Sequence, residues 1–348
     1  MGIRAFANVL PVAGVLLASG AGLAQQTPEQ FYKGKEVFLI IGSGVGGGYD
    51  MYSRVLARHW GRHIPGNPTI VVQNMPGAGG INMLNHMANI AKQDGSVVGS
   101  AFANTVIEPV FDKGKVTKYD SRKLNWLGSV SPQSISCFTR KDSPVKTLQD
   151  ALQKEAIIGT TGGSISAMTA NVINTLLGTK FKIVMGYTTE ETTLAIERGE
   201  VEGTCLSSAT LIVRHPDWIA EKKVNWLVLM SNKPDPLMPG TPLTVDFAKS
   251  DDDRKVIDLI ISQLSMGRPY VAPPNVPADR LDALRTSFFA TLKDPKFLEE
   301  AKKAEMIIDP SDHTEMEKMI NYTYTIDERI VAKAKALIDG TPQGPAKK

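Results

Sequence analysis

The segment that decides the fold class reads Val37-Phe38-Leu39-Ile40-Ile41, followed by Gly42-Ser43-Gly44-Val45-Gly46-Gly47-Gly48. Its first five residues are all apolar, which is typical of a strand covered on both faces. The glycines then predict a tight turn. A helical pattern follows, with Asp50 as its expected N-cap. The segment therefore predicts a strand, a glycine-rich turn and a helix in that order.

The same order of elements recurs along the chain. Residues 69–72 predict a second strand, residues 76–80 a second glycine-rich turn before a helix, and residues 97–102 a third strand. Because helices connect these strands, we expect a parallel, doubly wound sheet. A similar unit starts near residue 133, with strands expected at residues 135–139, 157–160, 181–185, 201–205 and 226–230. At roughly 150 residues per domain, the 348 residues predict two α/β domains.

The N-terminal segment predicts export from the cytoplasm. Residues 1–24 contain one cation, Arg4, then an apolar stretch and small residues that end at Ala24, as in a secretory signal peptide. A membrane anchor needs about 20 apolar residues, whereas this stretch is shorter and contains Pro11. We therefore expect cleavage after Ala24 and a mature protein outside the cytoplasm. Residues 341–348 are expected to form a disordered tail.

The overall charge and the cysteine count exclude several classes of protein. With 39 Lys+Arg against 36 Asp+Glu, the formal charge is only +3, which argues against a dedicated nucleic-acid binder. Two cysteines are too few for a disulfide scaffold or a thiolate-rich zinc site. Cys137 and Cys205 both fall on predicted strands, and either one disulfide or two buried thiols fits that placement.

The glycine-rich turns predict anion binding without a cofactor. Gly42, Gly44 and Gly47 match the GxGxxG pattern of dinucleotide sites, which also requires an acidic residue at the end of the second strand. That strand ends in Gln73-Asn74, and export also argues against a nucleotide. Backbone N–H groups at a helix N-terminus nevertheless favour an anion. Two such turns at one edge of a parallel sheet therefore predict a site for a small carboxylate.

No other chemistry is favoured by the sequence. His59 and His63 have i, i+4 spacing, but the HExxH glutamate and a third ligand are missing, so we expect no metal site. The chain has no GxSxG turn, and Ser164 has no His and Asp that sequence can assign to it. We therefore expect no catalytic residues and no enzymatic activity.

Five short motifs resemble one family of receptors. The chain carries, in order, GGGYD at residues 46–50, NMPGAGG at 74–80, KYD at 118–120, GEVE at 199–202 and VAPPNVP at 271–277. These resemble motifs of the Bug-type extracytoplasmic solute receptors of tripartite tricarboxylate transporters. The resemblance covers nearly the whole mature chain, and the second motif is the most specific.

The resemblance implies a type II periplasmic-binding-protein fold, with two doubly wound α/β lobes joined by crossing strands. The first lobe is expected to comprise residues 25–130 and 236–340, and the second lobe residues 131–235. The resemblance also implies that loop amides of the first lobe and bridging waters hold a ligand carboxylate. The ligand-binding residues expected by position are Ser43, Gly46, Gly47, Gly48, Ala78, Gly79, Gly80 and Asn104 in the first lobe, and Thr160, Thr161, Gly162, Ser164, Tyr187 and Ser207 in the second.

One departure from the family pattern bears on the ligand. Some members place an Asp, which can hold a ligand ammonium, where this chain has Leu206. We therefore expect a mono- or dicarboxylate without an amino group, with aromatic carboxylates among the candidates, unless Glu190 or Glu191 replaces that Asp. The expected receptor is a monomer that delivers its ligand to the membrane subunits of a tripartite tricarboxylate-type transporter. An exported sensor or a hydrolase on the same fold is the alternative.

Overall fold

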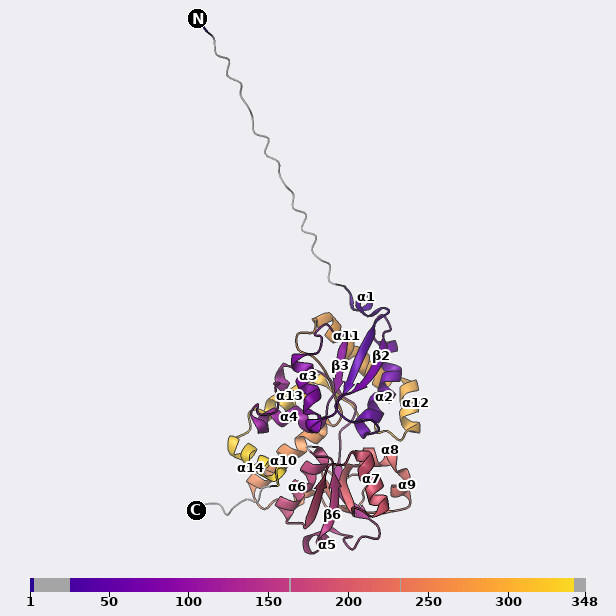
Figure 1. Ribbon diagram of the computed structural model, residues 1–348, viewed down its shortest axis with the longest axis vertical. Coiled ribbons are helices and arrows are strands. Elements are labelled where there is room, and N and C mark those ends of the chain that lie inside the picture. The colour runs from indigo at the N-terminus through magenta and orange to yellow at the C-terminus, as the bar shows by residue number, and fades with distance from the viewer. Residues whose placement is uncertain (3–25, 163, 232, 341–348) are drawn as a thin grey trace.

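The chain folds into two α/β lobes, one above the other in Figure 1. The computed structural model describes residues 1–2, 26–162, 164–231 and 233–340. The predicted signal peptide and the predicted tail therefore lie almost entirely outside the described residues. Within the described ranges, no helix is both long and apolar enough to span a membrane.

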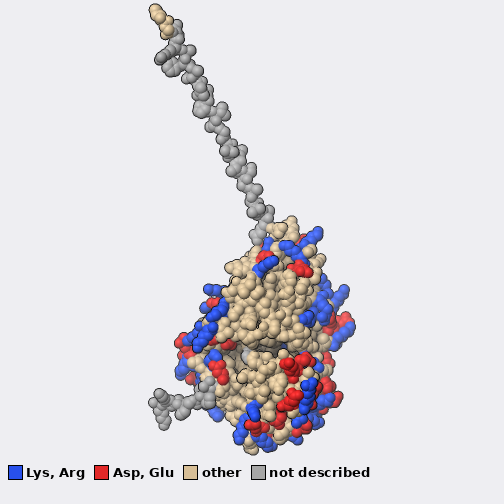
Figure 2. Space-filling model, in the orientation of Figure 1, with Lys and Arg blue, Asp and Glu red and all other residues tan. Residues whose placement is uncertain are grey.

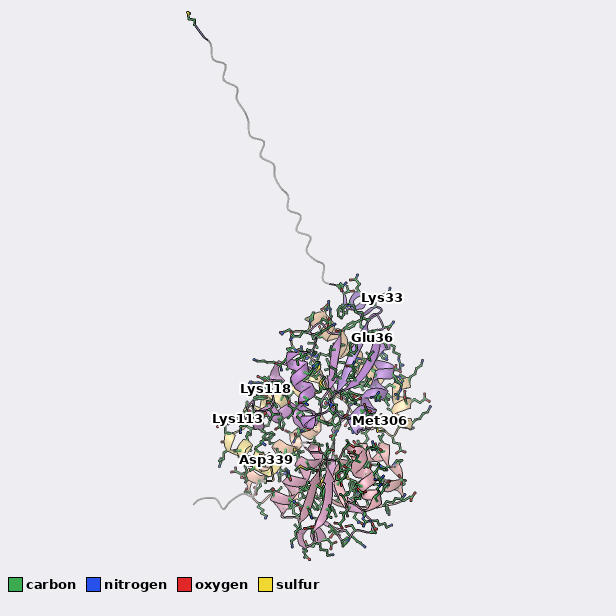
Figure 3. All side chains as sticks on the ribbon, in the orientation of Figure 1. Lys33, Glu36, Lys113, Lys118, Met306 and Asp339 are labelled. Carbon is green, nitrogen blue, oxygen red and sulfur yellow. A yellow bond between two sulfur atoms is a disulfide. The ribbon has the colours of Figure 1, made fainter. Side chains whose placement is uncertain are left out.

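Three parallel strands at the centre of the first lobe set up the binding edge. They are β1 (Glu36–Ile41), β2 (Thr69–Asn74) and β3 (Val97–Ser100). Ile41, the last residue of β1, pairs with Asn74 on one side and Ser100 on the other, so all three strands end together. Figure 3 shows Glu36, the first residue of β1, near the outer end of this lobe. The strands therefore run toward the second lobe, and the predicted parallel arrangement of these three strands is confirmed.

Helices and antiparallel strands complete the first lobe. The full sheet has the order β11-β4-β10-β3-β1-β2, in which β10 pairs antiparallel with both β3 and β4. The added strands are β4 (Asn125–Ser129), β10 (Pro269–Ala272) and β11 (Ser311–Asp312). The helices of this part are α1 (Pro28–Tyr32), α2 (Gly48–Trp60), α3 (Ile81–Asn89), α4 (Ala103–Asp112), α10 (Asp251–Met266), α11 (Ala278–Lys293), α12 (Pro295–Lys303), α13 (His313–Thr323) and α14 (Glu328–Ile338).

The second lobe has its own five-stranded sheet with the order β7-β6-β8-β5-β9. Its strands are β5 (Ile135–Arg140), β6 (Ala156–Thr160), β7 (Phe181–Met185), β8 (Gly203–Ser207) and β9 (Val224–Met230). Its helices are α5 (Leu148–Gln153), α6 (Ile165–Leu177), α7 (Thr189–Arg198), α8 (Ser208–Arg214) and α9 (Pro216–Ala220). As predicted, strands and helices alternate, and the two sheets belong to two lobes.

The chain crosses between the sheets twice. It leaves the first sheet after Ser129 and enters the second at Ile135, then leaves the second after Met230 and rejoins the first at Pro269. Helix α10 lies on the return path and packs against α4, α13 and α14. The proposed lobe boundaries, after residues 130 and 235, fall inside these two crossing intervals.

The prediction that Asp50 caps helix α2 is wrong. The helix begins at Gly48 and its N-cap is Gly47, so Asp50 lies in the first turn. The Asp50 carboxylate is buried and accepts hydrogen bonds from Gly46 N, Arg54 Nε and Asn74 Nδ2, at 2.9, 2.9 and 2.8 Å. Burial alone raises the pKa of Asp50, but the Arg54, Asn74 and Gly46 hydrogen bonds outweigh it and lower the pKa overall. Asp50 therefore secures the first glycine-rich loop from behind.

A disulfide links two neighbouring strands of the second sheet, β5 and β8. Cys137 on β5 and Cys205 on β8 lie directly opposite each other, with their Cα atoms 3.9 Å apart, and their sulfurs are bonded. Of the two interpretations that the sequence left open, the structure has the disulfide. Both residues are fully buried.

Candidate functional site

The candidate site is a cleft between the two lobes, visible as a hollow across the middle of the molecule in Figure 2. Its volume is about 300 Å³. On one side lie the loops that follow β1 and β2, and on the other the segments that follow β6 and β8. Because these loops follow the carboxyl ends of strands, the cleft occupies the place where open α/β sheets bind ligands.

The loop after β2 has an unusual backbone that only a glycine-rich sequence tolerates. Gly77, Ala78, Gly79 and Gly80 have successive φ values of 124, 47, 62 and 93°. At such positive φ values a Cβ atom clashes with the neighbouring backbone, which glycine avoids. At Gly80 an added Cβ would also lie 2.4 Å from Phe102 Cδ2. In the described part of the chain, the Ala78 and Gly79 N–H groups have no protein acceptor. They are therefore available to a ligand.

The loop after β1 supplies a second set of free donors. Gly47 caps α2 without any side-chain hydrogen bond, and the N–H groups of Gly47 and Gly48 find no acceptor among the described residues. The hydroxyl of Ser43 is buried nearby, and its Oγ has no hydrogen-bond partner among the described atoms. Unsatisfied donors at a helix N-terminus carry partial positive charge. This loop thus has the donor set that a carboxylate requires.

The second lobe contributes hydroxyl groups and apolar side chains. Thr161, Gly162 and Ser164 lie where β6 leads into α6, with Ser164 Oγ donating to Thr161 O at 2.6 Å. Ser207 and Thr210 line the cleft where β8 leads into α8. Among the described lining residues the only charged side chain is that of Glu190. Apart from Glu190, the surface of the cleft therefore consists of neutral hydrogen-bond donors and apolar groups.

An arginine connects the two lobes at the rim of the cleft. Arg214, at the end of α8, donates from Nη1 to the Gly46 carbonyl of the first lobe and from Nη2 to Glu190 of its own lobe. The Arg214 side chain is only 8% exposed, whereas that of Glu190 is 52% exposed. The half-exposed Glu190 carboxylate is therefore paired with Arg214 of its own lobe.

Ten of the fourteen expected binding residues line the cleft. They are Ser43, Gly47, Gly48, Ala78, Gly79, Gly80, Thr161, Gly162, Ser164 and Ser207. The other four do not. Gly46 contacts Asp50 and Arg214 at the rim, Asn104 is buried in the first turn of α4, and Thr160 is buried at the end of β6. Tyr187 lies beside a separate hollow with Met185 and Arg198.

Several lining residues were missed by sequence reasoning. Tyr49 and Phe102 pack edge to face with their ring centroids 4.5 Å apart, and both line the cleft. Gln133 lies on the first crossing segment and Thr210 on α8. Tyr49 was inside the quoted GGGYD motif and Phe102 was the last residue of a predicted strand, so their positions carried a usable signal. The positions of Gln133 and Thr210 depend on how the lobes meet.

The two histidines singled out by their spacing are held by different carboxylates. His59 Nε2 lies 2.5 Å from Glu300 Oε2, and His63 Nε2 lies 2.7 Å from Asp294 Oδ2. Over the described ranges, no three His, Cys, Asp or Glu side chains are grouped to hold a metal ion. The histidine pairs therefore join α2 and its end to α12 and the turn before it.

The fold and cleft define a two-lobed solute-binding protein, and comparison with known sequences gives its family. The profile of the tripartite tricarboxylate transporter family receptors matches residues 54–336, so the chain belongs to this family. A search of curated protein sequences gave no significant match.

Solved structures confirm the fold. The periplasmic binding protein BugD is similar with a TM-score of 0.70 and 19% identity, over 88% of this chain and 98% of that one. MatC from Rhodopseudomonas palustris, with bound malate, has a TM-score of 0.64 and 17% identity, over 87% and 99%. A further R. palustris protein, with adipate, has a TM-score of 0.66 and 15% identity, over 87% and 98%.

Proposed function

We propose that this protein is a periplasmic receptor that captures a small carboxylate in the cleft between its lobes and delivers it to the membrane subunits of a tripartite tricarboxylate-type transporter. Family membership supports the receptor role. The observation that carries the ligand class is the pair of glycine-rich loops, whose free N–H groups at Gly47, Gly48, Ala78 and Gly79 converge on one cleft. Hydrogen bonds to a charged group contribute about 1.5–3 kcal/mol each. A handful of them supports micromolar binding, about −8 kcal/mol.

The ligand is proposed to be a mono- or dicarboxylate without an amino group. Leu206 lines the cleft where some family members have an Asp. The two acids that were candidates to replace it have other partners: Glu190 pairs with Arg214, and Glu191 accepts from Thr188 N at the start of α7. Malate and adipate in the similar structures point to the same ligand class. A thermal-shift screen in which amino acids alone stabilise the protein would refute this preference.

The binding site is tested by substituting Gly79. A valine there would carry a β-branched side chain at a φ of 62°, at the cleft surface, and would disrupt the exposed donors. Isothermal titration with malate and adipate should give binding to the wild-type protein and none to Gly79→Val, with the circular dichroism spectrum unchanged. Unchanged affinity in the variant would place the ligand elsewhere.

A receptor role also predicts the fate of the ligand. A binding protein returns its ligand unchanged, whereas the alternative, an exported hydrolase on this fold, consumes it. Chromatography of the ligand after prolonged incubation with the protein should recover all of it intact. Steady loss of ligand that scales with protein concentration would favour the enzyme, and full recovery with no effect on uptake in a transporter-bearing cell would favour a sensor.

A further inference from the structure

A buried arginine lies behind the cleft without a carboxylate to pair with. The side chain of Arg268, at the end of the return crossing and directly before β10, is fully buried. It stacks over the ring of Tyr52 at 3.9 Å and donates to two hydroxyls: Nη1 to Ser131 Oγ at 3.1 Å and Nη2 to Thr210 Oγ1 at 3.2 Å. None of the ion pairs between described residues includes Arg268. Burying a charge without a counter-charge costs free energy. We therefore expect the Arg268 guanidinium to have a function in the protein.

The contact with Thr210 connects this charge to the cleft wall. Thr210 and Ser207 both line the cleft, their hydroxyl oxygens are 2.8 Å apart, and Ser207 Oγ also accepts from Thr210 N at 3.1 Å. Each hydroxyl has a single hydrogen to donate. One of the two hydrogens is used between the hydroxyls. The other has no acceptor among the described residues and is left for the cleft. Ser207 Oγ and Arg268 Nη2 both donate to Thr210 Oγ1, which fills the acceptor capacity of that oxygen. The hydrogen that remains for the cleft is therefore that of Thr210.

The donor pair lies against the first glycine-rich loop. An added Cβ at Gly48 would be 2.3 Å from Thr210 Oγ1, so the Thr210 hydroxyl is in contact with the start of α2. The free N–H groups of Gly47 and Gly48 belong to that same start. Donors from both lobes therefore meet at one point of the cleft, with a buried positive charge directly behind them.

We propose that Arg268 is a positioning residue for ligand charge: through Thr210 and Ser207 it directs a hydroxyl donor at an anionic oxygen of the ligand, and its guanidinium is the counter-charge of that anion. This inference rests on the proposed carboxylate-binding function and adds a residue from the return crossing, outside the glycine-rich loops. It predicts that Arg268 sets how strongly the cleft prefers a carboxylate over the matching neutral amide.

The test compares acids with their amides in matched variants. Adipate, malate and benzoate, each with its carboxamide analogue, are titrated calorimetrically into the wild-type protein and into Arg268→Met, which keeps the length of the side chain without its charge. For the acid that binds, Arg268→Met should weaken affinity ten-fold or more, while the affinity of the amide changes less than three-fold. Arg268→Lys, which keeps the charge, should recover part of the preference for the acid.

Arg280 provides the control for substitution of a ring-stacked arginine. It also stacks on an aromatic ring, that of Phe31 at 3.7 Å, and donates to Asp94 O, but it lies outside the cleft lining. Arg280→Met should leave the ratio of acid to amide affinity at the wild-type value. If Arg268→Met does not fold, Thr210→Val removes the hydroxyl while keeping the shape of the side chain, and it should lower the same ratio.

Each outcome decides a different claim. Equal loss of acid and amide affinity in Arg268→Met would mean that Arg268 only holds the return crossing in place. An unchanged ratio of acid to amide affinity in Arg268→Met or Thr210→Val would likewise overturn the inference. If the wild-type protein binds none of the acids, the proposed function itself fails, and the inference fails with it.

Discussion

Gly48→Ala should prevent the lobes from meeting as they do in this structure. The added Cβ would lie 2.3 Å from Thr210 Oγ1 and 3.0 Å from Thr210 Cγ2, against 3.4 Å for the nearest ordinary contact. Either the Thr210 side chain must rotate away from its hydrogen bonds with Ser207 and Arg268, or the two lobes must separate by about 1.1 Å at this point. Gly48 is the first residue of α2 and has no positive φ, so alanine fits the helix itself and raises its intrinsic stability. The clash thus opposes closure and leaves the folding of each lobe intact.

The size of the effect follows from the cost of overpacking, which is about 1–3 kcal/mol. We take the arrangement of the lobes in this structure as the closed, ligand-binding one. A cost confined to that arrangement reduces the apparent ligand affinity by about 5- to 150-fold. Isothermal titration with the tightest carboxylate measures the loss. Thermal unfolding of the free protein should give a melting temperature at or above that of the wild type.

Two further variants identify the cause. Gly44→Ala adds the same methyl group to the same loop, but its Cβ meets nothing within 4 Å, so its effect on affinity should be below three-fold. Adding Thr210→Ala to Gly48→Ala removes the two atoms that clash most and should restore part of the binding lost in the single variant. Wild-type affinity in Gly48→Ala would refute the argument. So would a double variant that binds no more tightly than Gly48→Ala.

Three other predictions follow from the same contacts. Arg214→Ala removes the bridge from α8 to the Gly46 carbonyl and should raise the ligand dissociation rate several-fold in stopped-flow measurements, with little change in melting temperature; an unchanged rate would show that the bridge does not hold the closed form. The Cys137–Cys205 disulfide spans 68 residues, so replacing both cysteines with alanine should lower the free energy of unfolding in urea by about 4 kcal/mol, and an equal stability would contradict this. Burial raises the pKa of Glu108 from 4.5 to about 7, so its contribution to stability is complete below pH 4.5 and is lost as the pH rises through 7. Glu108→Gln should therefore gain in melting temperature relative to wild type between pH 5 and pH 8, and a constant difference would be evidence against the raised pKa.

The alternation of strands and helices was predictable because it depends on local patterns. The apolar runs at residues 37–41 and 69–72 became β1 and β2, and the glycine-rich turns after them became the loops of the cleft. Backbone donors at a glycine-rich turn are fixed by the turn itself, so most of the expected residues of the first lobe reached the cleft. The sequence could reveal them because their geometry is local.

The rest depended on contacts between distant segments. Asp50 looked like a helix cap, but Asn74 and Gly46 hold its carboxylate within the first turn. Tyr49 donates to the carbonyl of Gly267, 218 residues away, and burial raises its pKa. Arg268 reaches the cleft wall only because the return crossing passes behind α8. No periodicity or motif in the sequence encodes these contacts between separate segments of the chain.

The central claim is that backbone N–H groups of the two glycine-rich loops hold the ligand carboxylate. A crystal structure of the protein with its tightest-binding carboxylate tests it directly. The claim predicts carboxylate oxygens within about 3 Å of the amide nitrogens of Ala78 or Gly79 and of Gly47 or Gly48, directly or through one water. A carboxylate bound only by lysine or arginine side chains, or bound outside this cleft, would contradict it.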